Sequence, residues 1–215
     1  VDVLHVRTLA QVREQAPKRG RFQLSLSLLV HAGQSSTASP RALHGCRHAA
    51  SIGHGVDVLS ETDGDGVADL MQDMRRADVM VEICLTSNRV LLGAAGEQHP
   101  LHDYLRADVP VALSTDDQGI FRTSITDEYL AAVRDQSLAY TQLKQLIRTG
   151  MEHAFVEGES LWAQRDRFDR TVRACRHDRL GTDLRSKPCE DYLSANKHAT
   201  LQGSSSASWP RSKQT

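Results

Sequence analysis

The feature that most constrains this fold is a repeated alternation between strand-like and helix-like segments. Residues 21–30, RFQLSLSLLV, place an apolar side chain at every second position, which is the periodicity of a β-strand. Later strand-like segments lie at 51–56, 79–85 and 110–115. They alternate with segments of helical spacing at 66–77 and 99–108. Strands separated by helices are typical of βα units around a parallel sheet, so we predict an α/β fold.

The flanking segments are predicted mostly as helices. Helical spacing covers 2–16, 40–50, 126–136 and 140–155. After Trp162 the pattern weakens, and we expect one polar-faced helix over 163–180 and another over 191–201. The final residues, 203–215, have low complexity and are expected to be disordered.

Composition and charge exclude several classes of protein. The 215 residues are 40% hydrophobic and 25% charged, with a formal net charge of −1, so we expect a globular chain that does not bind nucleic acid or an acidic membrane surface. No apolar run reaches the roughly 18 residues of a membrane span, and the N-terminus lacks a signal-peptide layout. The four cysteines are scattered without a C-x-x-C pair, which predicts incidental thiols in a cytoplasmic protein.

Polar residues with metal-binding or proton-transfer chemistry follow each predicted strand. His31 follows the first strand, His54 lies in a GHG turn after the second, 86–88 (TSN) follow the third, and Asp116 and Asp117 follow the fourth. The carboxyl ends of parallel strands gather at one edge, where α/β active sites lie. Histidine nitrogen and carboxylate oxygen are common zinc ligands, and a catalytic zinc activates water.

Each of these residues has a simpler interpretation when it is taken alone. His31 could be a packing residue, the GHG turn could be only a tight turn, and Asp116–Asp117 could cap a loop. Their joint placement at different strand ends favours the catalytic interpretation. The other histidines are predicted to be surface or packing residues, and His99, before Pro100, is expected to begin a helix.

Several motifs together resemble the second half of the adenosine deaminase family. They are HAGQ (31–34), SIGHGVDV (51–58), VEICLTSN (81–88), HPL (99–101) and STDD (114–117). The likeness runs from residue 3 to residue 202 and is strongest to the bacterial and growth-factor-related branch. It implies strands five to eight of a TIM-type (β/α)8 barrel over 1–165, a C-terminal helical segment over 166–202, and a disordered tail over 203–215.

The resemblance also implies a reaction and a role for each site residue. The family hydrolyses adenosine or deoxyadenosine to inosine or deoxyinosine and ammonia with one zinc ion. By resemblance, His31 and Asp116 would bind the zinc and His54 would polarise the attacking water. Asp117 would accept a hydrogen bond from the purine ring, and Gln34 occupies the position of the glutamate that protonates the purine.

Two departures from the family pattern predict impaired activity. No H-x-H pair occurs in the sequence, so two zinc ligands are missing, and the chain is expected to lack the first half of the barrel. Gln34 carries an amide, which can donate a hydrogen bond but cannot release a proton to the ring. Two alternatives are therefore a catalytically inactive nucleoside-binding protein, or a related aminohydrolase of adenine or another purine derivative. The H-x-E and P-C-x-x-C pattern of the other zinc deaminases is absent.

Overall fold

A four-stranded parallel sheet forms the centre of the protein. The computed structural model describes residues 29–32, 51–56, 58, 66–164, 167–178 and 185–207. The strands are β1 (Leu29–Ala32), β2 (Ser51–His54), β3 (Met80–Ile83) and β4 (Val111–Leu113), which lie in chain order and pair in parallel. The predicted parallel α/β arrangement is thus confirmed. The helices predicted over 2–16 and 40–50, and residues 21–28 of the first strand, lie outside the described residues.

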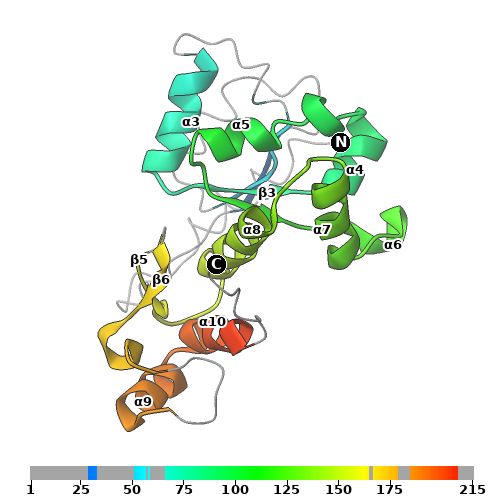
Figure 1. The fold of residues 1–215 in the computed structure, drawn as a ribbon. Coiled ribbons are helices and arrows are strands. Elements are labelled where there is room, and N and C mark those ends of the chain that lie inside the picture. The colour runs from blue at the N-terminus through cyan, green and yellow to red at the C-terminus, as the bar shows by residue number, and fades with distance from the viewer. Residues whose placement is uncertain are drawn as a thin grey trace, which may run out of the picture.

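Helices connect and cover the strands (Figure 1). They are α3 (Gly66–Arg76), α4 (Leu85–Leu92), η3 (Gly96–Gln98), α5 (Leu101–Arg106), α6 (Gln118–Phe121), α7 (Ile125–Arg134) and α8 (Tyr140–Glu152). Local sequence sets their ends. The Ser124 side chain caps α7 by a reciprocal bond with Asp127, and α4 ends at Gly93, whose φ is +68°. The residues 86–88, which follow the predicted strand over 79–85, lie in the first turns of α4.

One core lies between the sheet and its helices. Ile52, Val81, Ile83, Val111 and Leu113 from the strands pack with helix residues. The alternate positions Gly53, Glu82 and Ala112 are register partners across β2, β3 and β4, so they share the opposite face of the sheet. The Ser51 hydroxyl, on that same face, donates to Glu82 at 2.9 Å.

The C-terminal elements form a smaller unit beside α8 (Figure 1). An antiparallel pair, β5 (Trp162–Gln164) and β6 (Arg167–Thr171), is followed by η4 (Arg173–Cys175), α9 (Lys187–Ala195) and α10 (Lys197–Ala207). The single helix predicted over 163–180 is therefore wrong. Trp162 and Phe168 are both buried, with ring centroids 4.6 Å apart, and this aromatic contact favours the hairpin. Helix α10 also continues past residue 202, where the predicted helical segment ended.

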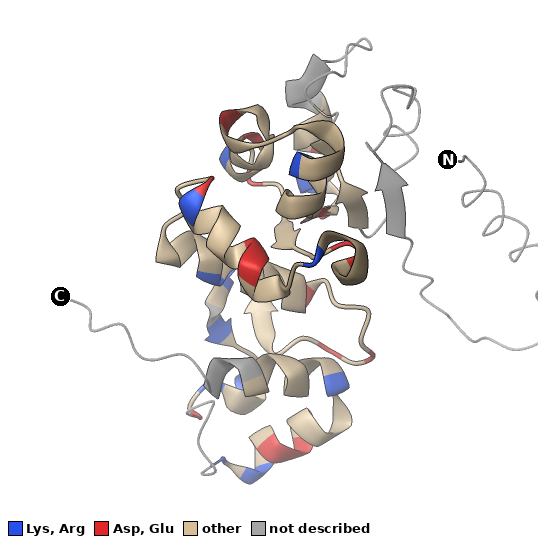
Figure 2. Cartoon of the chain, turned by 90° about the vertical axis from the view of Figure 1, so that its right-hand side faces the viewer, with Lys and Arg blue, Asp and Glu red and all other residues tan. Residues whose placement is uncertain are grey.

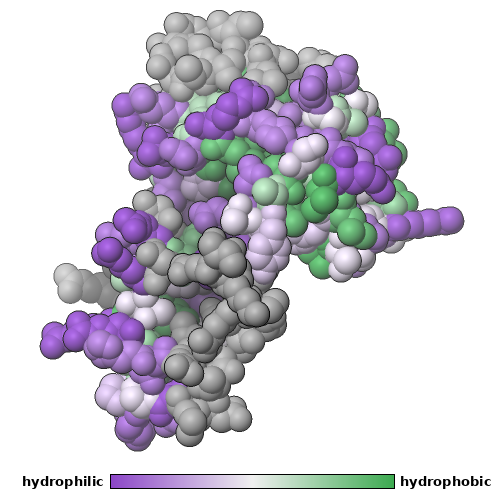
Figure 3. Space-filling model, viewed as in Figure 1, coloured by the Kyte–Doolittle hydropathy of each residue, from purple (hydrophilic) through white to green (hydrophobic). Residues whose placement is uncertain are grey.

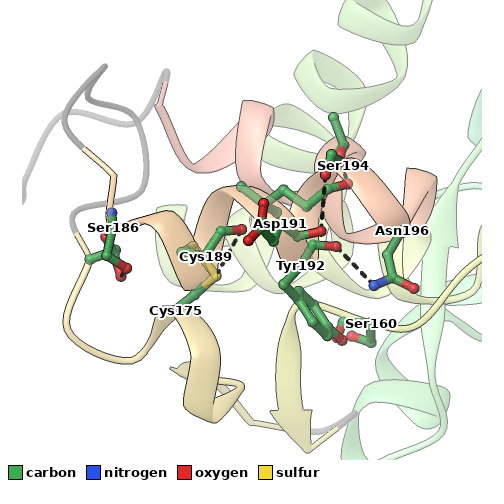
Figure 4. Close-up of a disulfide and its surroundings, with 11 residues drawn as sticks. Ser160, Cys175, Ser186, Cys189, Asp191, Tyr192, Ser194 and Asn196 are labelled. Atoms are coloured by element: carbon green, nitrogen blue, oxygen red, sulfur yellow. Dashed lines mark hydrogen bonds between the residues drawn. A yellow bond between two sulfur atoms is a disulfide. The ribbon is translucent and has the colours of Figure 1, made fainter.

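A disulfide between Cys175 and Cys189 holds this unit together (Figure 4). The prediction of incidental thiols is wrong for these two cysteines, because the fold brings residues 14 positions apart into contact. Around the bond, Leu161, Leu193 and Ala199 form a small core. The Tyr192 hydroxyl donates to the Ser160 carbonyl at 2.7 Å, which ties α9 to the segment before β5. Cys84 is free and buried.

The surface is mixed in charge and carries apolar patches. Acidic and basic side chains of the described residues are interspersed in Figure 2, in keeping with the net charge of −1. Figure 3 shows apolar surface on the side where α4 and α7 lie. Val90, Leu91 and Leu130 there are each more than half exposed. No helix in the described part of the chain is long and apolar enough to cross a membrane.

Candidate active site

Three adjacent strands deliver polar side chains to one edge of the sheet. His54 is the last residue of β2, Ser87 and Asn88 lie in the first turn of α4 directly after β3, and Asp116 follows β4. Because β2, β3 and β4 are neighbours and parallel, their carboxyl ends meet. The sequence predicted this edge as the site.

His54 and Asp116 lie close together at that edge. The Nε2 atom of His54 is 3.8 Å from Oδ2 of Asp116, and the two side chains are 2% and 25% exposed. The Ser87 hydroxyl donates to the same Oδ2 atom at 2.7 Å and so orients the carboxylate. Burial first, and then the charge of Asp116, raises the pKa of the Cys84 thiol to about 12. The Asp116 carboxyl group therefore lies near the buried thiol that follows β3.

The backbone at both residues is left-handed. His54 has a φ of +65° and Asp116 a φ of +55°, conformations that cost a non-glycine residue about 1–2 kcal/mol. Simple alternation along β2 would place His54 on the same face as Ile52, which packs against the helices. The left-handed conformation of His54 interrupts this alternation at the end of β2.

Gly55 makes this turn possible. Its φ is +58°, and a Cβ atom there would lie 2.6 Å from the Tyr104 hydroxyl oxygen and 3.0 Å from Val81 Cγ1. The Tyr104 hydroxyl donates to the Gly55 carbonyl at 2.7 Å, and Tyr104 is fully buried. The second glycine of the GHG motif is therefore required both by backbone conformation and by lack of space.

A buried hydrogen-bonded row supports His54 from behind. Nδ1 of His54 lies 3.0 Å from the Asn88 side-chain amide, and that amide lies 2.8 Å from Nε2 of His99. The Leu101 backbone N–H donates to Nδ1 of His99 at 3.1 Å. Burial, with a smaller contribution from the charge of His102, lowers the pKa of His99 to about 4, so its ring is neutral at physiological pH.

Glu128 fixes the start of α4 from the opposite side. Its carboxylate is fully buried on α7 and accepts from the Thr86 backbone N–H and from the Thr123 hydroxyl, each at 3.2 Å. A buried carboxylate is stable only when it is hydrogen-bonded. Glu128 thus holds the turn that carries Ser87 and Asn88.

Asp117 lies on the exposed rim of the same edge. Its Oδ1 atom accepts from the Ile120 N–H at 3.0 Å and caps α6. One carboxylate oxygen of Asp117 therefore has the capping role that was given above as the simpler interpretation. His31 lies in β1 with its Cα in register with Gly53, one position before the Ala32–His54 pair. The His31 side chain and all of Gln34 lie outside the described residues.

The donor types at this edge fit zinc. A carboxylate positioned by a hydroxyl, beside an imidazole, is a usual set of zinc-site groups. Within the part of the chain that the structure describes, no three His, Cys, Asp or Glu residues form a cluster able to hold a metal ion. Asp116 is the one predicted ligand whose side chain is described.

Sequence reasoning did not assign roles to several residues that build this edge. They are Ser87, Asn88, His99, Tyr104 and Glu128. Two of the motifs quoted above, TSN and HPL, contain Ser87, Asn88 and His99, so the motifs were visible but their side-chain contacts were not. Tyr104 and Glu128 lie at ordinary helical positions, where periodicity gives no sign of a polar contact.

Comparison with known proteins decides the family. The adenosine deaminase family model matches residues 14–171, which is most of the chain. The chain belongs to the adenosine deaminase family. The resemblance of the HAGQ, GHG, TSN, HPL and STDD motifs is thereby confirmed.

Relatives in this family carry names for more than one purine substrate. Over 144 residues the chain is 31% identical to an adenosine deaminase of Aliivibrio fischeri, covering 66% of this chain and 41% of that protein. It is 33% identical over 134 residues to an adenine deaminase of Sinorhizobium fredii, covering 61% and 40%. The chain thus spans about two fifths of the length of these curated relatives.

Solved structures show the same fold. An Arabidopsis N6-mAMP deaminase matches with a TM-score of 0.51 and 29% identity, over 61% of this chain and 37% of that one. The Arabidopsis protein ADAL in complex with IMP matches with a TM-score of 0.51, 28% identity and the same two shares. The described sheet therefore corresponds to part of a deaminase of this family.

Proposed function

We propose that this chain takes part in zinc-dependent hydrolytic deamination of adenosine or deoxyadenosine, and that Gln34 impairs the reaction. The observation that carries the proposal is the approach of His54 to Asp116, with Nε2 and Oδ2 3.8 Å apart at the ends of β2 and β4. Adenosine deaminases of Aliivibrio fischeri and of Shewanella loihica are among the relatives in the family.

The proposed roles are those that the resemblance to the family implies for each group. His31 and Asp116 would hold zinc, which, when bound, supplies a Lewis acid that activates water. His54 would polarise the attacking water, and its position is fixed by Asn88. Asp117, on the exposed rim, would accept a hydrogen bond from the purine through the oxygen that does not cap α6. Ser87 would keep the Asp116 carboxylate in place.

Gln34 is proposed to lack the proton that the purine ring needs when water attacks it and ammonia leaves. Attack of water at the ring carbon that carries the amino group places negative charge on the ring, and a nearby acid must neutralise it. A glutamine amide donates a hydrogen bond but holds its protons. Loss of such an acid typically lowers a rate by about 10²–10⁴. Gln34→Glu is therefore expected to restore activity by a factor in that range.

The test joins this chain to the remaining part of a relative, which would supply the other proposed zinc ligands. The segment of the Aliivibrio fischeri adenosine deaminase that aligns with this chain is replaced by the corresponding residues of this chain, with zinc present. Deamination of adenosine is followed by ammonia release, for the chimaera with Gln34 and for the chimaera with Gln34→Glu. Gln98→Glu, the same chemical change at an exposed position in η3, is the matched control. Asp116→Asn is expected to remove activity.

The outcomes separate the candidate functions. A rate gain in Gln34→Glu that is absent in Gln98→Glu supports the proposal. Equal activity with Gln34 and with Glu would show that this account of Gln34 is wrong. The chimaeras could also fold and bind purine riboside in calorimetry, yet deaminate no adenosine with either Gln34 or Glu at this position. That result would favour a nucleoside-binding protein without catalysis.

A related purine substrate is the second candidate, because relatives include adenine deaminases and a structural neighbour is an N6-mAMP deaminase. The same chimaeras report on the part of the substrate pocket that this chain contributes. A shift of preference from adenosine to adenine or N6-mAMP, relative to the unmodified Aliivibrio enzyme, would favour this candidate.

A further inference from the structure

The hydrogen bonds that join His54, Asn88, His99 and Leu101 indicate which nitrogen of each histidine ring carries the hydrogen. Each contact is short, at 3.0, 2.8 and 3.1 Å in that order. The three polar side chains are each about 99% buried. In such surroundings an unmade or mismatched hydrogen bond costs about 1–3 kcal/mol, so donors and acceptors must match along the row.

His99 sets the direction of the row. The Leu101 backbone N–H can only donate, so Nδ1 of His99 must carry a lone pair. A neutral imidazole has one protonated nitrogen, and therefore Nε2 of His99 carries the hydrogen. Rotating the ring by half a turn would place ring carbons toward both partners and lose both bonds. His99 is thus a donor toward Asn88.

The Asn88 amide must then turn its oxygen toward His99. In the structure Oδ1 of Asn88 faces Nδ1 of His54 and Nδ2 faces Nε2 of His99, an orientation that opposes two donors at the His99 contact. An amide oxygen and nitrogen have nearly the same shape, and the hydrogen-bond network decides between them. With Oδ1 toward His99, Nδ2 donates to Nδ1 of His54, and all three contacts pair one donor with one acceptor.

We propose that Asn88 and His99 are positioning residues that keep Nδ1 of His54 a hydrogen-bond acceptor, so that the ring hydrogen lies on Nε2. This nitrogen lies 3.8 Å from Oδ2 of Asp116, so His54 presents an N–H donor to the active-site edge. Such a ring stabilises negative charge that develops on an attacking oxygen. It has no lone pair at Nε2 with which to take a proton. The catalytic meaning rests on the proposed function, whereas the tautomer itself follows from the hydrogen bonds.

The tautomer is measured directly by nitrogen NMR on the whole chain, with ¹⁵N-labelled histidine at pH 8. Chemical shifts and two-bond couplings of each ring show which nitrogen carries the hydrogen. His54→Gln and His99→Gln variants assign the two rings. In the wild type, we expect both rings to be protonated at Nε2 and unprotonated at Nδ1. A wild-type His54 protonated at Nδ1 would overturn the proposal.

Asn88→Asp tests the cause without changing the size of the side chain. A carboxylate accepts from both neighbours, so it is expected to draw a proton onto Nδ1 of His54 while His99 keeps its Nε2 hydrogen. Asn196→Asp is the matched control, because Asn196 lies in the C-terminal unit, where it bonds Tyr192 and Glu159. A folded Asn88→Asp protein whose Nδ1 stays unprotonated would also contradict the proposal.

These measurements do not depend on turnover. If His54 carries its proton at Nε2 but the chimaeras described above are inactive, the hydrogen-bond row stands and the proposed function fails. If the chimaeras are active while wild-type His54 is protonated at Nδ1, the row fails and the proposed function stands. The two proposals are therefore tested separately.

Discussion

Replacing Gly55 by alanine tests the structural basis of the GHG turn. The new Cβ would lie 2.6 Å from the Tyr104 hydroxyl oxygen, far inside normal contact, on a backbone with φ at +58°. The left-handed conformation costs about 1–2 kcal/mol for alanine. Overpacking against Tyr104 and Val81 adds about 1–3 kcal/mol. We expect Gly55→Ala to lower the free energy of unfolding by about 3 kcal/mol in all.

Gly93→Ala is the matched control for the backbone cost. Its φ is +68°, similar to that of Gly55, but nothing lies within 4 Å of the position of its Cβ. The control should therefore lose only about 1 kcal/mol. Urea denaturation measures both variants. With a slope of about 2 kcal/mol per molar urea, the midpoint of Gly55→Ala should lie roughly 1 M below that of Gly93→Ala.

A double variant isolates the contact with Tyr104. Tyr104→Phe removes the hydroxyl oxygen, after which the closest atoms to the new Cβ are Val81 Cγ1 at 3.0 Å and the ring carbon Cζ at 3.3 Å. Gly55→Ala should then cost less in the Tyr104→Phe background than in the wild type, by at least about 0.5 kcal/mol. Equal losses for Gly55→Ala and Gly93→Ala, or strict additivity with Tyr104→Phe, would refute the steric argument.

Two further predictions concern the disulfide and the buried histidine. Removing the disulfide in the double variant Cys175→Ser/Cys189→Ser should lower the free energy of unfolding by about 3 kcal/mol, since the bond joins residues 14 positions apart. A reducing agent should lower the urea midpoint of the wild type and leave that of the variant unchanged. Burial lowers the pKa of His99 from 6.5 to about 4, so the unfolded chain binds this proton first and stability is lost as the pH falls through that window. Urea denaturation should show that the free energy of unfolding falls by about 3 kcal/mol between pH 7 and pH 4. This fall should be smaller in His99→Gln and retained in His177→Gln, an exposed site; identical pH dependence in the two variants would contradict the assignment to His99.

Sequence patterns were informative where one local rule decides the structure. The strands at Ser51–His54, Met80–Ile83 and Val111–Leu113 lie within their predicted ranges, because a short apolar segment between polar turns has few other ways to be buried. Periodicity failed after Trp162. There the contact between the rings of Trp162 and Phe168, on the two strands of the hairpin, favours a hairpin over a helix.

The motifs did not show which element carries TSN. These residues follow the predicted strand over 79–85, and the structure places them in α4, where Glu128 accepts from the Thr86 N–H. A hydrogen bond between residues 42 positions apart leaves no trace in local periodicity.

The amino-acid sequence was enough to predict the parallel βα units, the family, and the edge of the sheet at which His54 and Asp116 lie. These follow from short-range patterns and motif spacing. The tertiary structure alone decided how those residues are held: the left-handed turn at His54, the Ser87 bond to Asp116, and the direction of the row through Asn88 and His99. Each depends on atoms that distant segments bring within hydrogen-bond distance, where the matching of donors with acceptors, rather than residue type, fixes the chemistry.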